Sequence, residues 1–130
     1  MMHFIEVPIA TGELIDKITI LELKASRFTD AAKTANVRAE LALLCQRRDA
    51  VLGQTPAIDH LATRLRALNE ELWRLEDQIR EYERRKDFGS DFVTTARSIY
   101  RTNDERAAVK REINVATGSK LIEEKSYVGY

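Results

Sequence analysis

The sequence predicts an all-α fold, in which two long helices form an antiparallel, coiled-coil-like hairpin and two further helices pack on it. Two observations carry this prediction. Apolar residues recur at alternating three- and four-residue steps through most of the chain, which is the spacing of one face of an α-helix. The 130 residues include only five glycines and two prolines, so few positions interrupt a helix. The length suits one domain, and we expect residues 1–130 to form a single helical domain with a C-terminal tail over residues 119–130.

The first part of the chain should hold a short extended segment and two helices. Residues 3–9 are rich in β-prone side chains and contain a proline, so we expect them to be extended. Thr11 suits the N-cap of a first helix, whose apolar surface is broad enough to pack on more than one side and make this helix the central element. A second helix should begin after Asn36 and end at Gly53.

The third helix has the clearest pattern. Thr55-Pro56 places a capping residue before a proline at the first helical position. A heptad repeat then runs without a miss to about residue 86, through Ile58, Leu61, Leu65, Leu68, Leu72, Leu75, Ile79 and Tyr82. The connection to the second helix is short, so these two helices are expected to form the hairpin. The third helix is the longer one, and its uncovered leucines predict contact with another helix or with a second subunit in a homodimer.

A fourth helix should follow the break at Asp87-Phe88-Gly89 and end at Gly118. Thr102 and Glu105 fit a capping box, so the helix either continues through Thr102 or restarts there. The tail can dock on the body or present a recognition peptide, and we expect it to dock.

Charge and composition exclude several classes of function. Lys and Arg together number 21, as do Asp and Glu, so the chain lacks the basic surplus that nucleic-acid binding requires. His3, His60 and Cys45 are too dispersed for a metal site, and no motif indicates a cofactor. No apolar run is long enough to span a membrane, and the N-terminus lacks a basic leader. We therefore expect a cytoplasmic protein without a metal or cofactor.

The candidate site is a polar interruption of the fourth helix's apolar stripe. Continuing that stripe at heptad spacing brings Asn103, Arg106 and Lys110 to inward positions. Inward-facing cations need partners, and these can come from the first and third helices. Two interpretations remain open: the cations belong to ion pairs within the protein, which we favour, or the cluster holds a small anionic ligand. The residues that could supply partners are Glu13, Asp16, Lys17, Asn69, Trp73 and Glu76.

The chain resembles a family of short bacterial proteins known only as a domain of unknown function. The resemblance covers nearly the whole chain and rests on residues 5–24 (IEVPIATGELIDKITILELK), Leu72-Trp73, Glu76-Asp77, Ile79-Arg80, Phe88-Gly89, residues 96–100 (ARSIY), Asn103-Asp104 and residues 123–127 (EEKSY). It implies no activity, but it places Glu13, Asp16, Lys17, Arg97, Asn103 and the tail in the family's signature.

A second, local resemblance names an enzyme. Residues 14–18 (LIDKI), continuing to Arg27, are similar to the first helix of all-helical chorismate mutases, although Gly12 and Glu13 stand where those enzymes carry an arginine. Such enzymes bind a dicarboxylate between helices through Arg and Lys, which implies a comparable role for the polar cluster. Our leading interpretation is a non-enzymatic interaction or assembly protein that forms a homodimer, with an unidentified protein partner also conceivable. A small-anion-binding enzyme of the mutase type is the alternative.

Overall fold

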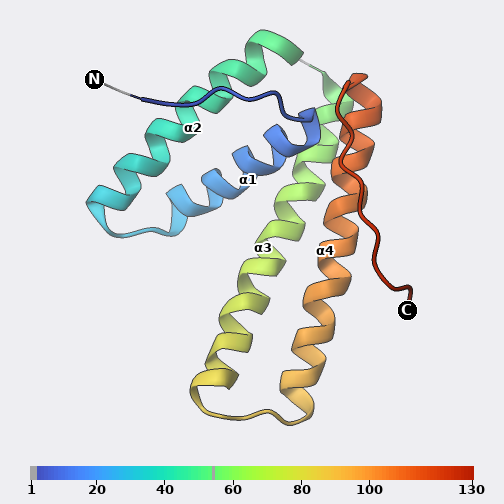
Figure 1. Ribbon diagram of the computed structural model, residues 1–130. Helices are drawn as coiled ribbons and strands as arrows, with labels where there is room; N and C mark the ends of the chain where they lie inside the picture. The colour runs from blue at the N-terminus through green and yellow to red at the C-terminus, as the bar shows by residue number, and fades with distance from the viewer. Residues whose placement is uncertain (1–2, 54) are drawn as a thin grey trace.

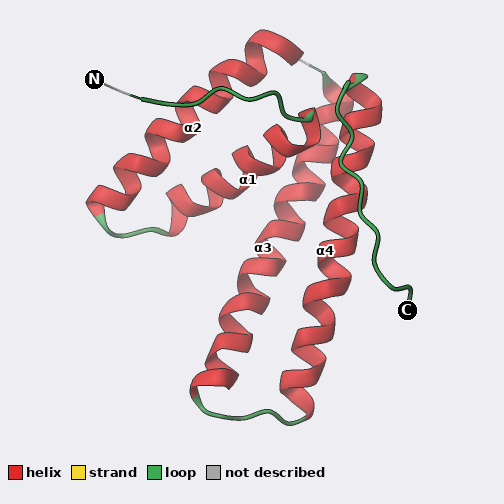
Figure 2. Ribbon diagram, in the orientation of Figure 1, coloured by secondary structure: helices red, strands yellow, loops and turns green. Residues whose placement is uncertain are grey.

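The computed structural model describes residues 3–53 and 55–130, and it confirms the all-α fold. Four helices follow one another along the chain: α1 (Thr11–Arg27), α2 (Ala31–Leu52), α3 (Pro56–Arg84) and α4 (Ser90–Thr117). Figure 1 shows a short hairpin of α1 and α2 that leans away from a longer hairpin of α3 and α4. Figure 2 shows that the connections and both ends of the described chain are loops, with no strand in these two stretches.

Helix α1 is the central element, as the breadth of its apolar surface predicts. It contacts all three other helices. Ile15 faces α3 and α4 and belongs to a core cluster with Ile58, Leu65, Val109 and Ile113, while Ile18, Leu21 and Leu23 are buried as well. A helix that is apolar around so much of its circumference is stable only when several neighbours cover it.

The predicted hairpin of the second and third helices is wrong. Helix α3 pairs along its length with α4, whereas α2 packs mainly on α1. The physical reason is length and amphipathicity: α3 and α4 have 29 and 28 residues, while α2 has 22 and buries only Val37 among its side chains. A leucine seam as long as that of α3 is covered best by a partner of equal length.

One helix start differs from the sequence prediction, whereas the end of α4 agrees with it. Helix α2 begins at Ala31 rather than after Asn36, because the Asp30 carboxylate accepts a hydrogen bond from the Lys33 N–H at 2.9 Å and acts as the N-cap. Helix α4 continues through Thr102 without a restart and ends at Gly118, whose left-handed backbone (φ 65°) suits glycine. The continuous α4 therefore keeps Arg106 and Lys110 on its inward side.

Extended segments flank the helices. Residues 3–9 are exposed before α1, and residues 119–130 run back alongside α4 (Figure 1). The tail contacts α4 at both ends: the Arg111 guanidinium donates to the Glu124 carboxylate at 3.0 Å, and the Tyr130 hydroxyl donates to the Asp104 carboxylate at 2.5 Å. The tail is thus docked on the helix. None of the four described helices combines the length and apolar character that crossing a membrane requires.

Candidate functional site

A buried carboxylate lies where α1, α3 and α4 meet. Asp16, on the inner face of α1, is only 1% exposed. The Arg106 side chain of α4 reaches it with two hydrogen bonds, from Nε at 3.0 Å and from Nη2 at 2.5 Å. Such a two-point contact fits the planar guanidinium to the carboxylate and fixes its orientation. The hydrogen bond to Asp16 raises the pKa of Arg106, so the arginine stays charged.

Helix α3 contributes the third partner. The Asn69 amide donates to the Asp16 carboxylate and to the Thr19 hydroxyl, each at 2.9 Å, and Thr19 in turn donates to the Asp16 backbone carbonyl. Among the described residues, no buried side-chain polar atom lacks a hydrogen-bond partner. The cluster is therefore fully satisfied, which is the condition under which a buried charge is tolerated.

Lys110 joins this cluster to the tail. Its Nζ donates to the Glu13 carboxylate at 2.7 Å and to the Glu123 carboxylate at 3.0 Å, and it lies 4.0 Å from the Asp16 carboxylate. Burial by itself lowers the pKa of Lys110, but the hydrogen bonds to Glu13 and Glu123 outweigh it and raise the pKa above its ordinary value. Hydrogen bonds from Lys110 and Lys125 lower the pKa of Glu123.

Helix α4 also caps α1. Ala10 occupies the N-cap position of α1 and has no side chain that could accept a hydrogen bond. The side-chain amide oxygen of Asn114, Oδ1, takes that role across the interface and accepts from the Gly12 N–H at 2.7 Å. A Cβ at Gly12 would lie 2.3 Å from the Lys110 carbonyl oxygen, so the two helices approach this closely only because residue 12 is glycine.

Residues 5–129 match the model of one protein family, which spans the extended N-terminal segment, the four helices and almost all of the tail. The chain belongs to this family of unknown function, DUF6165. No curated protein and no solved structure matches the chain.

In this DUF6165 chain, half of the predicted site residues meet in the buried cluster. Hydrogen bonds or ion-pair distances join five of them, which are Glu13, Asp16, Asn69, Arg106 and Lys110. Three more border a crevice of about 310 Å³ between α1, α3 and α4, which Arg106 also lines; these are Trp73, Glu76 and Asn103. The Glu76 carboxylate at this crevice is already paired with Arg80.

Two predicted residues stand apart from both the cluster and the crevice. Lys17 is exposed on α1 and Arg97 is exposed on α4, and no ion pair within the described stretches joins either of them to Asp16 or Lys110. Trp73 is half-buried and packs against the Phe28 ring at 6.2 Å between centroids, with the Arg27 guanidinium over its face. Its surroundings are those of a packing residue.

Sequence reasoning missed Gly12, Asn114 and Glu123. Gly12 is visible as the single glycine at a predicted helix start, a position where a close backbone approach is one explanation. Asn114 follows Ile113 on the inward face of α4, so extending the polar interruption by one residue would have included it. Glu123 belongs to the tail motif of the family resemblance (residues 123–127), but its contact with Lys110 was not predictable because it depends on the path of the tail.

Across the part of the chain that the structure describes, no group of three or more His, Cys, Asp or Glu side chains is placed to hold a metal ion. The only cysteine, Cys45, is half-buried on α2 and unpaired.

Proposed function

We propose that this protein is a non-enzymatic association protein that forms a homodimer through its extended N-terminal segment, residues 3–9, called the N-terminal arm below. One observation carries the proposal. The arm presents four large apolar side chains to solvent, of which Ile5 is 90% exposed and Val7 64% exposed, with Phe4 and Ile9 beside them. Contiguous exposed apolar residues of this kind are typical of surfaces that a partner covers.

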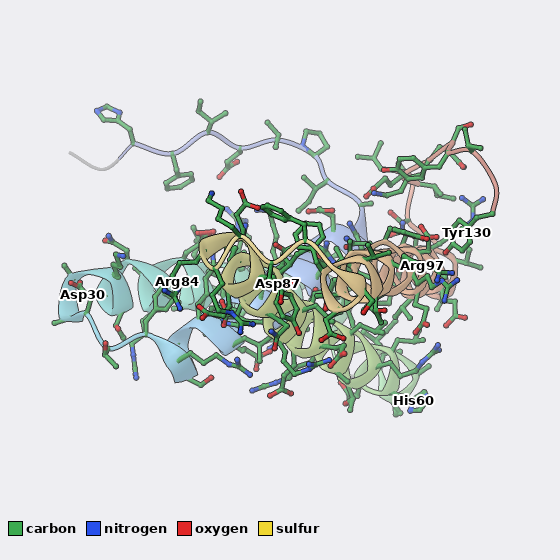
Figure 3. The ribbon with its side chains drawn as sticks, turned by 90° about the horizontal axis from the view of Figure 1, so that it is seen from below. Asp30, His60, Arg84, Asp87, Arg97 and Tyr130 are labelled. Carbon is green, nitrogen blue, oxygen red and sulfur yellow. The ribbon has the colours of Figure 1, made fainter. Side chains whose placement is uncertain are left out.

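The arm has little support from its own chain. Figure 3, seen from below, shows it running clear of the helices with its side chains projecting on both sides. Its one ion pair joins the Glu6 carboxylate to Arg47 on α2 at 3.2 Å, between two exposed side chains, and such a pair contributes little stability. If a second copy of the chain covered these apolar side chains, their burial would stabilise the dimer by roughly 25 cal/mol for each Å² of apolar surface removed from water. Dimers with two-fold symmetry are also the commonest oligomers.

The polar cluster supports a structural rather than a catalytic role. A mutase-type site would need Arg106 and Lys110 free to hold a dicarboxylate. Carboxylates of the same chain already fill these positions, Asp16 beside Arg106, and Glu13 with Glu123 beside Lys110. The same proposal places the protein in the cytoplasm, where a lone thiol such as Cys45 stays reduced.

Light scattering at micromolar concentration tests the proposal. We expect the wild-type chain to have about twice its mass of 14.9 kDa, and Ile5→Asn to shift it toward a monomer that keeps the helical circular dichroism spectrum, since Ile5 is exposed and contributes nothing to the core of one chain. Val115→Asn is the matched control, because Val115 is 67% exposed but belongs to α4 and not to the arm. A monomeric wild type, or equal dissociation in both variants, would refute the role of the arm.

A further inference from the structure

A cleft of about 520 Å³ lies between the middle of α4 and the end of the tail, apart from the N-terminal arm. Ile99, Asn103 and Arg106 line it from the helix, and Lys125, Tyr127 and Tyr130 line it from the tail. The volume falls within the range of small-molecule sites in proteins, roughly 300–1,000 Å³. The association proposed above uses none of these residues.

Aromatic rings form much of the wall. Tyr100 and Tyr130 meet edge to face with their centroids 5.2 Å apart, and the Tyr130 hydroxyl is held by the Asp104 carboxylate. Tyr127 adds a third ring from the tail, and Ile99 and Val128 add aliphatic surface. The contact with Tyr100 and the hydrogen bond to Asp104 orient the Tyr130 ring, and the exposed ring surface offers an apolar face to a planar group.

The cations at the cleft are not equally available. Lys110 already donates to two carboxylates. Arg106 uses Nε and Nη2 for Asp16, and its Nη1 makes only a long contact of 3.5 Å with the Asn103 amide oxygen. Lys125 has one ionic partner, Glu123 at 3.2 Å. The donors that remain for a ligand are thus on Arg106 Nη1 and Lys125, enough for one anionic group.

We propose that this cleft binds a small aromatic monoanion, a planar ring that carries one carboxylate. The ring lies against the tyrosines, and the carboxylate is held between Arg106 Nη1 and Lys125. Lys110 is surrounded by three carboxylates, Glu13, Glu123 and Asp16, whose negative charge disfavours a second carboxylate there, so the site discriminates against dicarboxylates. The tail supplies one wall and one of the two cations, and the ligand therefore strengthens the docking of the tail on α4.

Naphthoate is a suitable probe, and its neutral isostere naphthamide is the matched ligand control. We expect saturable binding of naphthoate by calorimetry, accompanied by shifts of the Tyr127 and Tyr130 ring resonances in NMR spectra. Naphthamide should bind about tenfold more weakly, which corresponds to about 1.4 kcal/mol, since it lacks the charge that Arg106 and Lys125 hold.

Two variants locate the site, and both change exposed tail residues that the helices do not need. Lys125→Met should weaken naphthoate about tenfold and leave naphthamide unchanged, whereas Tyr127→Ala should weaken both ligands. Lys120→Met, which removes a tail lysine outside the cleft, and Ile5→Asn, in the arm, should bind both as the wild type does. The proposal is overturned if naphthoate does not saturate, if naphthamide binds equally well, or if Lys120→Met loses as much affinity as Lys125→Met.

Discussion

Asp16 is the residue on which three helices converge. Removing a carboxylate from water costs several kcal/mol even after relaxation, and only well-aligned partners offset this cost. Arg106 supplies two aligned donors and Asn69 a third, from two different helices. A contact of this kind contributes orientation as well as energy, because α1, α3 and α4 must be in register for all of its hydrogen bonds to form.

Replacing Arg106 by Met should lower the free energy of unfolding by about 3–5 kcal/mol, the range for a buried pair that loses one partner. Met keeps much of the apolar volume, but it leaves the Asp16 carboxylate buried with Asn69 as its only direct partner and Lys110 at 4.0 Å. Chemical denaturation measures this change.

Arg64→Met is the matched control, since Arg64 also bridges two helices through its ion pair with Glu112 at 3.0 Å, but between exposed side chains. That surface pair should contribute about 0–1 kcal/mol. Equal losses in the two variants would show that Asp16 does not depend on Arg106.

The sequence predicts these inward charges because they interrupt an apolar stripe. Asn103, Arg106 and Lys110 were expected to face inward, and the structure places the latter two against α1 carboxylates, whereas Asn103 is exposed. The pairing of each acid with each cation was not predictable, because it depends on the axial position of α1 relative to α4. Periodicity gives the face of a helix and not its position along a neighbour.

At the scale of elements, the approach of α1 to α4 depends on one missing side chain. We expect Gly12→Ala to destabilise the protein by about 1–3 kcal/mol, the usual cost of overpacking a tight contact. The added Cβ meets the backbone of α4 at the Lys110 carbonyl, which cannot rotate away, and it also crowds Asn114. Because this crowding pushes α1 away from α4, the hydrogen bond between Gly12 and Asn114 that caps α1 would lengthen.

Thermal unfolding measures this effect, and Gly129→Ala is the control because nothing lies within 4 Å of a Cβ at that position. Alanine in place of Gly129 should leave the melting temperature unchanged. If alanine at residue 12 is equally harmless, the two helices are not held as closely as the Gly12 contact requires.

Most helix positions were predictable from the sequence, whereas the start of α2 and the helix partners were not. The heptad of α3 marks a helix from Pro56, and the structure has one from Pro56 to Arg84. The same heptad cannot say which helix covers it, and the short connection to α2 suggested the wrong neighbour. Helix α4, with its polar interruption, has the weaker pattern but the matching length, and length decided the pairing.

At the scale of the whole molecule, the tail is part of the folded structure. It returns along α4 (Figure 1), and the family match extends to residue 129. Lys110 holds it through Glu123 while also holding α1 through Glu13. Tail docking and the packing of α1 on α4 therefore share one cation.

This shared cation makes tail docking depend on pH. The hydrogen bonds from Lys110 and Lys125 lower the pKa of Glu123 below its unfolded value of about 4.3. A carboxylate with a lowered pKa contributes stability above its unfolded pKa and loses this contribution as the pH falls through its folded pKa. We expect the tail to be ordered at neutral pH and to leave α4 as the pH falls through the lowered pKa of Glu123, below the ordinary range of a glutamate side chain.

Backbone relaxation of residues 120–130 in NMR spectra reports this release, and Glu123→Gln separates the Glu123 contact from the other carboxylates nearby. The amide keeps the shape of the side chain but cannot carry the charge that attracts Lys110, so the tail of this variant should already be more mobile at neutral pH. The other carboxylates that face the tail or its cations are the same in the wild type and in Glu123→Gln; these are Glu13, Asp16, Asp104 and Glu124. Protonation of these carboxylates alone would therefore loosen the tail equally in the wild type and in the variant. A wild-type tail no more ordered at neutral pH than that of Glu123→Gln would mean that Lys110 does not hold it.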